Sequence, residues 1–205
     1  MDAIELRADW TRPSTPPRIP TVQAVYIAFL QLAARIFSCL AYRFRVRGRN
    51  NVPEHGAALI VANHPSFIDA VILGGFARRP VRFVMDHKFY NTPLLHWIVR
   101  CARAIPIASR KENPTLVDQA FEEIDRALAE GEVVVIFPEG KVSRDGAMSP
   151  FRPGVERILR RRSVPVIPAA LSGMWGSFFS FAHGTRPLRG RPRRFRAAVE
   201  LAFGE

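Results

Sequence analysis

Strand-like and helix-like patterns alternate along most of this chain. Short apolar runs typical of strands occupy residues 57–63, 81–85, 132–137, 164–171 and 195–203. The run that starts at Val133 has no polar alternation, which predicts a strand covered on both faces. Strands separated by helices predict an α/β domain in which a mixed, mostly parallel sheet is flanked by helices.

Helical patterns fill the intervals between these strands. The clearest begins at Asn113-Pro114, an N-cap followed by proline at the first helical position, and ends at Gly131. Apolar residues recur every four positions between these two ends. Further helices are predicted at residues 67–76, 93–101 and 152–162, the last of them strongly basic.

Residues 21–42 form the longest apolar stretch of the chain. At 100° per residue, Gln31, Arg35 and Ser38 fall on one narrow face and leave the rest apolar. A central arginine costs about 2.5–3.5 kcal/mol in a membrane span. We therefore expect an amphipathic helix that lies in the membrane interface. A core helix of the globular domain and a true single span are the alternatives.

The N-terminal segment and the cysteines favour a cytoplasmic setting. Residues 1–20 are Pro-rich and contain acidic residues, unlike the basic-then-apolar order of a signal peptide. Cys39 and Cys101 lie far apart in apolar segments, so we expect buried packing residues in a reducing compartment. The expected location is the cytoplasmic face of a membrane.

The chain is strongly basic, with 30 Lys+Arg against 18 Asp+Glu and a net charge of +12. This balance indicates an anionic partner: a phospholipid surface, a phosphorylated substrate or a nucleic acid. Six arginines crowd residues 186–196 and could contact lipid headgroups. No recognised nucleic-acid-binding signature accompanies them. An anionic phospholipid membrane is therefore the expected partner, and nucleic acid is not.

The first candidate for chemistry is the segment NHPSFID, in which His64 and Asp69 follow a predicted strand. Sheets of this class build their sites where strands end. A histidine can accept a hydroxyl proton near neutral pH, and a carboxylate partner fixes its tautomer and stabilises the imidazolium. Ser66 and Asp69 also have the spacing of a capping box, so a structural role for Asp69 stays open. A short helix beginning at Ser66 would serve both roles.

The second candidate is the segment FPEG, directly after the strand at residues 132–137. Glu139 could grip a polar ligand, and Gly140 would let the backbone approach it closely. Lys141 and Arg144 follow and could hold a phosphate. Taken alone, Glu139 could equally belong to an ordinary acidic turn, and the two cations could be ordinary surface charges.

Together with VPVIPAAL, these segments match in order the motifs of the glycerolipid acyltransferases, which include lysophosphatidic acid acyltransferase. The resemblance runs from about residue 52 to residue 171. It implies that His64 is the catalytic base and Asp69 its partner, and that Glu139 and Gly140 bind the acceptor. It also implies that residues 43–205 form an acyltransferase α/β domain, with residues 164–168 as the strand behind the site. The family's N-terminal helices embed in one leaflet, so a peripheral or monotopic attachment is expected.

The implied reaction moves a fatty acyl group from an acyl-CoA or acyl carrier protein thioester to the free hydroxyl of a lysophospholipid, such as 1-acylglycerol-3-phosphate, in phospholipid synthesis or remodelling. No metal and no cofactor beyond the thioester donor are expected. Backbone amides near Gly140 are the expected oxyanion donors. Further substrate contacts are expected from Asn63, Ser66, Arg110, Lys141 and Arg144.

The sequence departs from the family pattern in ways that leave the acceptor open. Lys141 and Val142 stand where many members have Thr and Arg, and Arg110 matches only loosely the phosphate-binding arginine that follows an apolar strand. The segment LSGMWGSFF is similar to proteins that reacylate lysophosphatidylethanolamine, so that lipid or a lyso-aminolipid is an alternative acceptor. An alternative of another class is a non-catalytic lipid-binding membrane protein.

Overall fold

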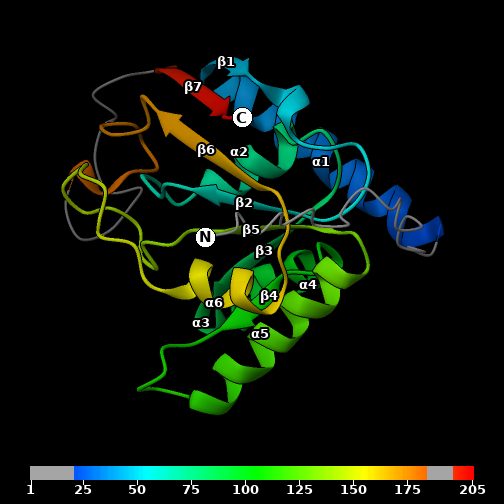
Figure 1. The fold of residues 1–205 in the computed structure, drawn as a ribbon. Coiled ribbons are helices and arrows are strands. Elements are labelled where there is room, and N and C mark those ends of the chain that lie inside the picture. Colours follow the sequence, from blue (N-terminus) through cyan, green and yellow to red (C-terminus); the bar gives the residue numbers. More distant parts are fainter. Residues whose placement is uncertain (1–20, 184–195) are drawn as a thin grey trace, which may run out of the picture.

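The protein is built around one seven-stranded sheet with the strand order β1-β7-β6-β2-β5-β3-β4 (Figure 1). In this computed structural model, which describes residues 21–183 and 196–205, neighbouring strands run parallel except β6 and β7. The five strands from β6 to β4 therefore share one carboxyl edge. The predicted α/β fold with a mixed, mostly parallel sheet is confirmed.

The strands are β1 (Arg43–Arg47), β2 (Ala58–Ala62), β3 (Val81–Asp86), β4 (Ile105–Ile107), β5 (Val133–Ile136), β6 (Val166–Ser172) and β7 (Ala198–Phe203). The helices are α1 (Thr21–Ala41), α2 (Asp69–Phe76), α3 (His87–Tyr90), α4 (Pro93–Cys101), α5 (Pro114–Ala129) and α6 (Gly154–Arg161), with short 3₁₀ turns η1 (Arg49–Asn51) and η2 (Phe181–His183).

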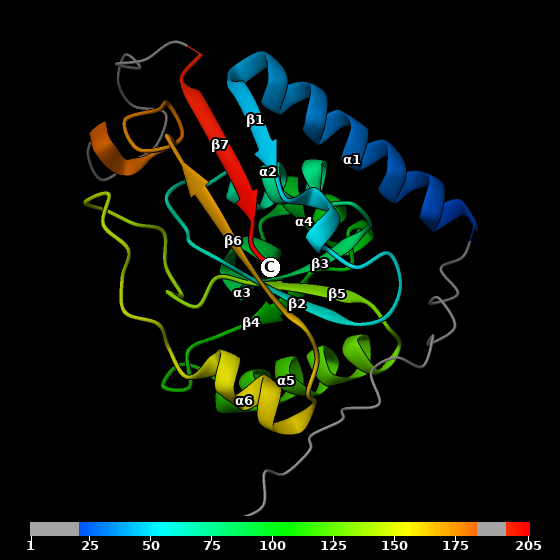
Figure 2. The same cartoon turned by 45° about the horizontal axis from the view of Figure 1, so that its top comes forward.

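Two apolar layers cover the sheet, one on each face. Side chains of α2, with Tyr42 from the end of α1, pack with β2, β6 and β7 on one face. Side chains of α5 and α6 pack with β2, β5 and β4 on the other. Figure 2 shows α1 and α2 on one side of the sheet and α5 and α6 on the opposite side. Strand β5 is buried along its whole length, as its uninterrupted apolar run predicts.

The boundaries follow the local sequence signals closely where a cap is present. The Asn113 side chain accepts a hydrogen bond from the amide of Leu116 (2.9 Å), with Pro114 in the first turn of α5. Strand β1 was not predicted, because its RFRVR pattern places three exposed arginines around only two apolar side chains. Helix α6 begins at Gly154 rather than residue 152.

Helix α1 turns its polar stripe toward the domain and its apolar surface outward. Gln31 Nε2 donates to the carbonyl of Gly74 (3.1 Å) and Arg35 Nε to that of Gly75 (3.0 Å), both in α2. A side chain at position 75 would collide with the backbone of α1, so glycine allows the two helices to approach. The core-helix alternative is wrong, since most of the large apolar side chains of α1 are exposed: Val22, Val25, Phe29, Leu32, Ile36, Phe37 and Leu40.

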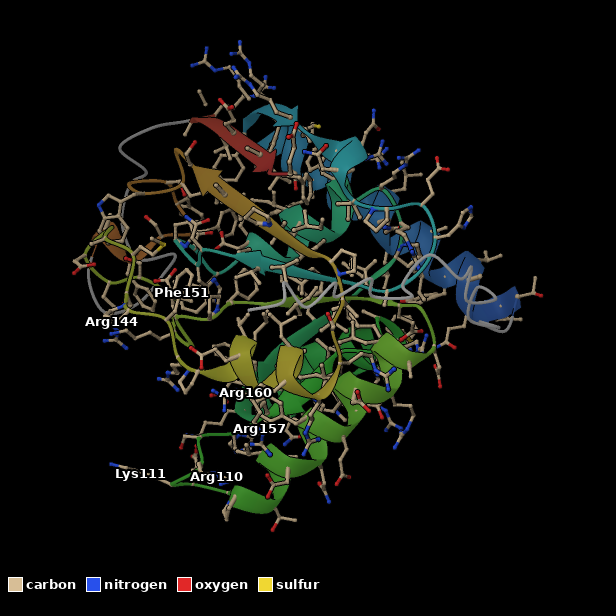
Figure 3. The ribbon with its side chains drawn as sticks, in the orientation of Figure 1. Arg110, Lys111, Arg144, Phe151, Arg157 and Arg160 are labelled. Carbon is tan, nitrogen blue, oxygen red and sulfur yellow. The ribbon has the colours of Figure 1, made fainter. Side chains whose placement is uncertain are left out.

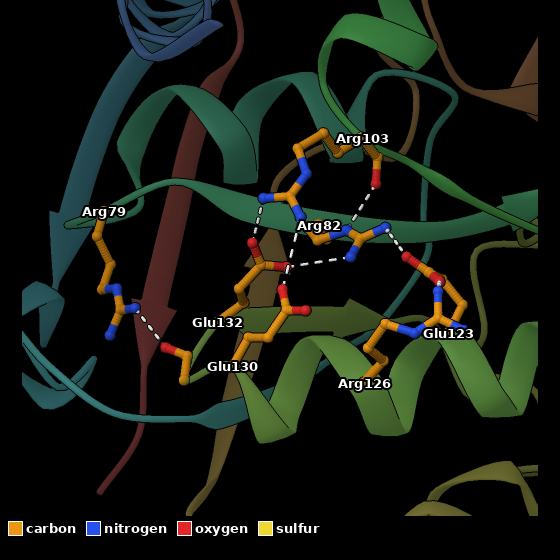
Figure 4. Close-up of polar contacts among 8 residues, drawn as sticks. Arg79, Arg82, Arg103, Glu123, Arg126, Glu130 and Glu132 are labelled. Carbon is orange, nitrogen blue, oxygen red and sulfur yellow. Dashed lines mark hydrogen bonds and ion pairs between the residues drawn. The ribbon is translucent and has the colours of Figure 1, made fainter. Parts of the chain in front are cut away.

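An ion-pair network at the amino edge of the sheet connects β3 with α5 and with the segments that precede β4 and β5 (Figure 4). Arg82 of β3 donates to Glu132 (3.1 Å), to Glu123 (2.7 Å) and to the carbonyl of Arg103 (2.8 Å). Arg103 forms a second ion pair with Glu132. Both carboxylates and both guanidinium groups are paired, so their mutual attraction and hydrogen bonds offset the desolvation cost of burying the charges.

Some expectations are corrected or fall elsewhere. Cys39 is exposed and Cys101 half-buried, so neither is the buried packing residue that was expected. The apolar surroundings of Cys39 are the outward face of α1. The Pro-rich segment 1–20 lies outside the described residues, as does the arginine cluster except Arg196, which donates to the carbonyl of Cys39 (3.2 Å).

Candidate active site

The two predicted motifs meet at the carboxyl edge of neighbouring strands. Strand β2 ends at Ala62 and β5 at Ile136, and the two pair in parallel register. The loops that follow them therefore start side by side, which brings His64 and Glu139 together. Parallel strands commonly place their sites at this edge.

His64 and Asp69 form a hydrogen-bonded pair. The distance from His64 Nδ1 to Asp69 Oδ2 is 2.8 Å. Because an ionised carboxylate can only accept, Nδ1 carries the proton and Nε2 is the basic nitrogen. The imidazole is 18% exposed and stacks on the ring of Phe137, with centroids 4.1 Å apart. This arrangement leaves Nε2 for the proton of a bound hydroxyl.

Asp69 is held by the turn that precedes α2. The amide of Ser66 donates to the same Asp69 Oδ2 (2.8 Å), and Ser66 Oγ accepts from the amide of Ile68 (3.2 Å). The helix begins at Asp69, so the predicted start at Ser66 is wrong, but half of the capping-box interaction is present. Asp69 thus serves the helix and His64 together.

Burial raises the pKa of Asp69 above its ordinary value, while the hydrogen bonds from His64 and Ser66 act in the opposite direction. Both bonds fall on Oδ2; Oδ1 is buried without a hydrogen-bond partner in the described part of the chain. Burial also raises the pKa of Tyr42, whose hydroxyl donates to Ser177 Oγ (3.0 Å) and which lies within range of the Asp69 charge. Tyr42 directly follows α1, so the end of this helix lies near the His64–Asp69 pair.

Glu139 holds two backbone segments and is 2% exposed. Its Oε1 accepts from the amide of His64 (2.8 Å) and its Oε2 from the amide of Ser149 (2.7 Å). The amide of Ser143, two residues beyond Lys141, donates to the carbonyl of His64 (2.8 Å). The peptide groups of His64 are thus fixed from both sides by the loop that follows β5.

Gly140 adopts a left-handed conformation with φ of 65°. A Cβ at this position would lie 2.7 Å from Nε of Arg152, so only glycine fits the turn without displacing that side chain. The amide of Gly140 donates to the carbonyl of Phe137 (3.0 Å). Because it is engaged inside the turn, this amide is not available as the expected oxyanion donor.

The other predicted substrate-binding residues occupy different places. Asn63 forms two hydrogen bonds with the backbone of Leu171, at 2.9 and 2.7 Å, which tie the end of β2 to β6. Ser66 is fully buried. Lys141 and Arg144 are exposed in the loop after β5. Substrate contacts from these residues stay predictions.

Arg110 follows β4 at the same carboxyl edge, three strands from β2, or roughly 14 Å across the sheet. Its guanidinium pairs with Asp118 Oδ1 (3.0 Å), which also accepts from Arg157 (2.7 Å). Arg157 and Arg110 together hold the pKa of Asp118 below its ordinary value. A contact between Arg110 and a substrate phosphate stays a prediction.

The profile of the acyltransferase family matches residues 43–172, which run from β1 to the end of β6 and include both motifs. The chain belongs to the acyltransferase family. Among solved structures, the 1-acyl-sn-glycerophosphate acyltransferase PlsC from Thermotoga maritima has a similar fold, with a TM-score of 0.68 and 23% identity over 89% of this chain and 69% of that one.

Curated relatives of this acyltransferase-family chain are similar over its central part. A 1-acyl-sn-glycerol-3-phosphate acyltransferase from Pseudomonas aeruginosa is 31% identical over 62% of this chain and 49% of its own length. A chloroplastic one from Brassica napus is 26% identical over 64% of this chain and 38% of its own. A lyso-ornithine lipid O-acyltransferase from Rhizobium meliloti is 32% identical over 52% and 35%. The chain thus spans less than half the length of these three relatives.

Two features of the acyltransferase-family site were missed in the sequence. Phe137 supports the His64 ring, and Ser143 fixes the His64 carbonyl while its own buried hydroxyl donates to the carbonyl of Ala147 (2.9 Å). Phe137 was visible as the first residue of FPEG, but nothing in the pattern indicates its stacking partner. The signal for Ser143 was only its nearness to that motif.

Proposed function

We propose that this protein transfers a fatty acyl group from a thioester to the free hydroxyl of a lysophospholipid, such as 1-acylglycerol-3-phosphate. The observation that carries the proposal is the His64–Asp69 pair at the carboxyl edge of the sheet, in which Nε2 has no hydrogen-bond partner among the described residues. The names of the relatives agree, since two name acyltransferases of 1-acyl-sn-glycerol-3-phosphate and one an O-acyltransferase of lyso-ornithine lipid.

The chemistry needs one base and no covalent enzyme intermediate. Nε2 of His64 takes the proton of the acceptor hydroxyl as its oxygen attacks the thioester carbonyl carbon. Asp69 orients the imidazole and stabilises its charged form. When the tetrahedral intermediate collapses, the C–S bond breaks, and the proton on Nε2 passes to the leaving thiolate. The products are an ester and a free thiol, so atoms and charge balance.

The membrane supplies the acceptor in this proposal. Strand β1 is antiparallel to the five strands from β6 to β4, so it starts at their carboxyl edge. The end of α1, which directly precedes β1, therefore lies at the same edge as His64. Phe37 near that end contacts Phe179, with ring centroids 5.8 Å apart. The outward face of α1 would rest among acyl chains, and a lysolipid could move from there to the site. The proposed location is the cytoplasmic face of a membrane, with α1 in the interface.

The test combines an acceptor panel with intact-protein mass spectrometry. Purified protein receives a palmitoyl thioester together with 1-acylglycerol-3-phosphate, lysophosphatidylethanolamine or a lyso-ornithine lipid. We expect one diacyl product and an equal amount of free thiol. With the donor alone, the protein mass should stay unchanged. An acyl adduct on the protein would contradict the one-step mechanism. Failure of the protein to form any product would favour the non-catalytic lipid-binding alternative.

A further inference from the structure

Basic side chains gather on one flank of the molecule, beside an exposed aromatic ring (Figure 3). Arg110 and Arg160 are 63% and 83% exposed, and Phe151 is 55% exposed. Met148, in the same loop as Phe151, is 64% exposed. The "basic surface" consists of Arg110, Lys111, Arg144, Phe151, Arg157 and Arg160.

The basic surface is fixed in shape by a shared carboxylate. The surface is carried by three segments: the loop before α5, the loop between β5 and α6, and α6 itself. Asp118 of α5 accepts from Arg110 in the first segment and from Arg157 in α6, so it joins these two. The Arg157 guanidinium also stacks 4.0 Å from the ring of Phe121. Four acidic side chains accompany the five cations: Asp118, Glu156 beside Arg160, Asp145 beside Arg144, and Glu112 beside Lys111, which is itself paired with Lys88 outside the surface. The surface is therefore positively charged and partly preorganised.

The loop between β5 and α6 is part of the basic surface and also contacts His64. Arg144 and Phe151 lie in the loop between β5 and α6, and Arg144 lies over the ring of Phe181, 5.2 Å from its centroid. This is the loop whose Glu139 and Ser143 hold the peptide groups of His64. A partner bound at Phe151 would therefore be next to the loop that frames the reacting atoms.

Most of the basic surface lies away from the membrane-facing helix. Arg110, Lys111, Arg157 and Arg160 belong to the loop before α5 and to α6, whereas α1 packs on α2 at the other face of the sheet. Arg144 lies over Phe181, whose ring contacts Phe67 just before α2, and so forms the border of the surface. Both Figure 1 and Figure 2 show α1 and α6 on opposite sides of the sheet. With the apolar face of α1 in lipid, the basic surface would face the aqueous side.

From this placement we infer that the basic surface docks an acidic carrier protein that delivers the acyl thioester to His64. The inference rests on the proposed acyl transfer and specifies its donor. These cations are spread over three segments around exposed apolar side chains and are not gathered at one point, an arrangement that favours a partner with a broad contact area. Arginine, methionine and aromatic residues together are typical of protein interfaces. Charge complementarity would accelerate the encounter and select against neutral partners.

The experiment compares two donors that carry the same acyl chain, palmitoyl-acyl carrier protein and palmitoyl-CoA, with one lysophospholipid acceptor in detergent micelles. The test variant is Lys111→Glu/Arg160→Glu, because both side chains are exposed and neither forms a hydrogen bond or an ion pair with His64 or Asp69. The matched control is Arg43→Glu/Arg45→Glu on the edge strand β1, which makes the same change in charge. Donor kcat/KM is measured at low and high salt.

For the carrier protein donor, we expect Lys111→Glu/Arg160→Glu to lower kcat/KM by about tenfold or more at low salt, with a smaller loss at high salt. The value for palmitoyl-CoA should stay within about twofold of wild type, and the control variant should resemble wild type with both donors.

Three results would overturn the inference while leaving acyl transfer intact. These are a wild type that uses only palmitoyl-CoA, an equal loss with both donors, and no loss with the carrier protein. A loss of binding to anionic phospholipid vesicles, with carrier-protein kinetics unchanged, would assign the surface to the membrane instead. If neither donor gave product, the proposed function itself would fail.

Discussion

Replacing Glu139 with alanine should damage catalysis through the position of His64 rather than through acceptor binding. The resemblance assigns Glu139 to the acceptor, but both of its carboxylate oxygens accept from backbone amides, those of His64 and Ser149. Alanine would leave two partly buried N–H groups without an acceptor, at about 1–3 kcal/mol each when fully buried. Water entering the vacated space would recover part of this, so the free energy of unfolding should fall by about 3 kcal/mol.

The catalytic effect follows from geometry. A displacement of about 1 Å in a reacting group can lower a rate by about 100-fold. We therefore expect Glu139→Ala to lower kcat by about that factor, with the acceptor KM within about threefold of wild type. Glu139→Gln keeps one acceptor oxygen and should fall between wild type and the alanine variant in both stability and kcat.

Thermal unfolding and steady-state kinetics on the same preparations would test this reasoning. A loss of about 3 kcal/mol corresponds to a fall in Tm of roughly 6–12 °C for a chain of this length. The matched control is Glu122→Ala on the exposed face of α5, which should change stability by less than about 0.5 kcal/mol. A stable Glu139→Ala protein with normal kcat and a strongly raised acceptor KM would refute the positioning role.

Three further variants test separate parts of the structure. Asp69→Asn should lower kcat by about 10²–10⁴. It should also raise Tm at neutral pH. Because burial raises the pKa of Asp69, the stability that this carboxyl contributes is present at acidic pH and is lost as the pH rises through the folded-state pKa. A Tm difference between variant and wild type that did not shrink in acid would contradict this. Gly140→Ala should cost about 1–2 kcal/mol from its positive φ, with a further loss as Arg152 is displaced, and an unchanged urea midpoint would refute it. Glu132→Ala should lower the free energy of unfolding by about 3 kcal/mol, near the low end for breaking a buried ion pair, because Arg82 keeps its bond to Glu123. The kcat of the folded fraction should stay at the wild-type value, and a loss of kcat would show that the amino edge influences the site.

Much of the fold could be predicted because its signals are local. The apolar run of β5 and the Asn113 N-cap of α5 depend on neighbouring residues alone, and both are found where the sequence indicates. Strand β1 escaped prediction because its partner, β7, lies about 150 residues away and supplies the backbone pairing that the local pattern of β1 does not reveal. The direction of the polar stripe of α1 was equally invisible, since it depends on the carbonyls of α2.

The proximity of the candidate residues His64, Asp69 and Glu139 was predictable, but their hydrogen bonds were not. His64 and Asp69 are brought together as the spacing suggested, because a short turn separates them. Glu139 was correctly placed beside the site, but its sequence neighbours do not show that both oxygens are taken by backbone amides. Arg110 likewise has a partner, Asp118, that becomes adjacent only when the loop folds back on α5.

The most direct test of the central claim is product formation by His64→Ala beside wild type, followed by mass spectrometry with a thioester donor and the lysophospholipid panel. Circular dichroism and thermal unfolding would establish that both proteins are folded. The account predicts a diacyl product and free thiol from wild type. It predicts a rate at least 100-fold lower from His64→Ala, because that variant lacks the base that removes the proton of the acceptor hydroxyl. A folded His64→Ala protein that kept more than about a tenth of the wild-type rate would contradict it.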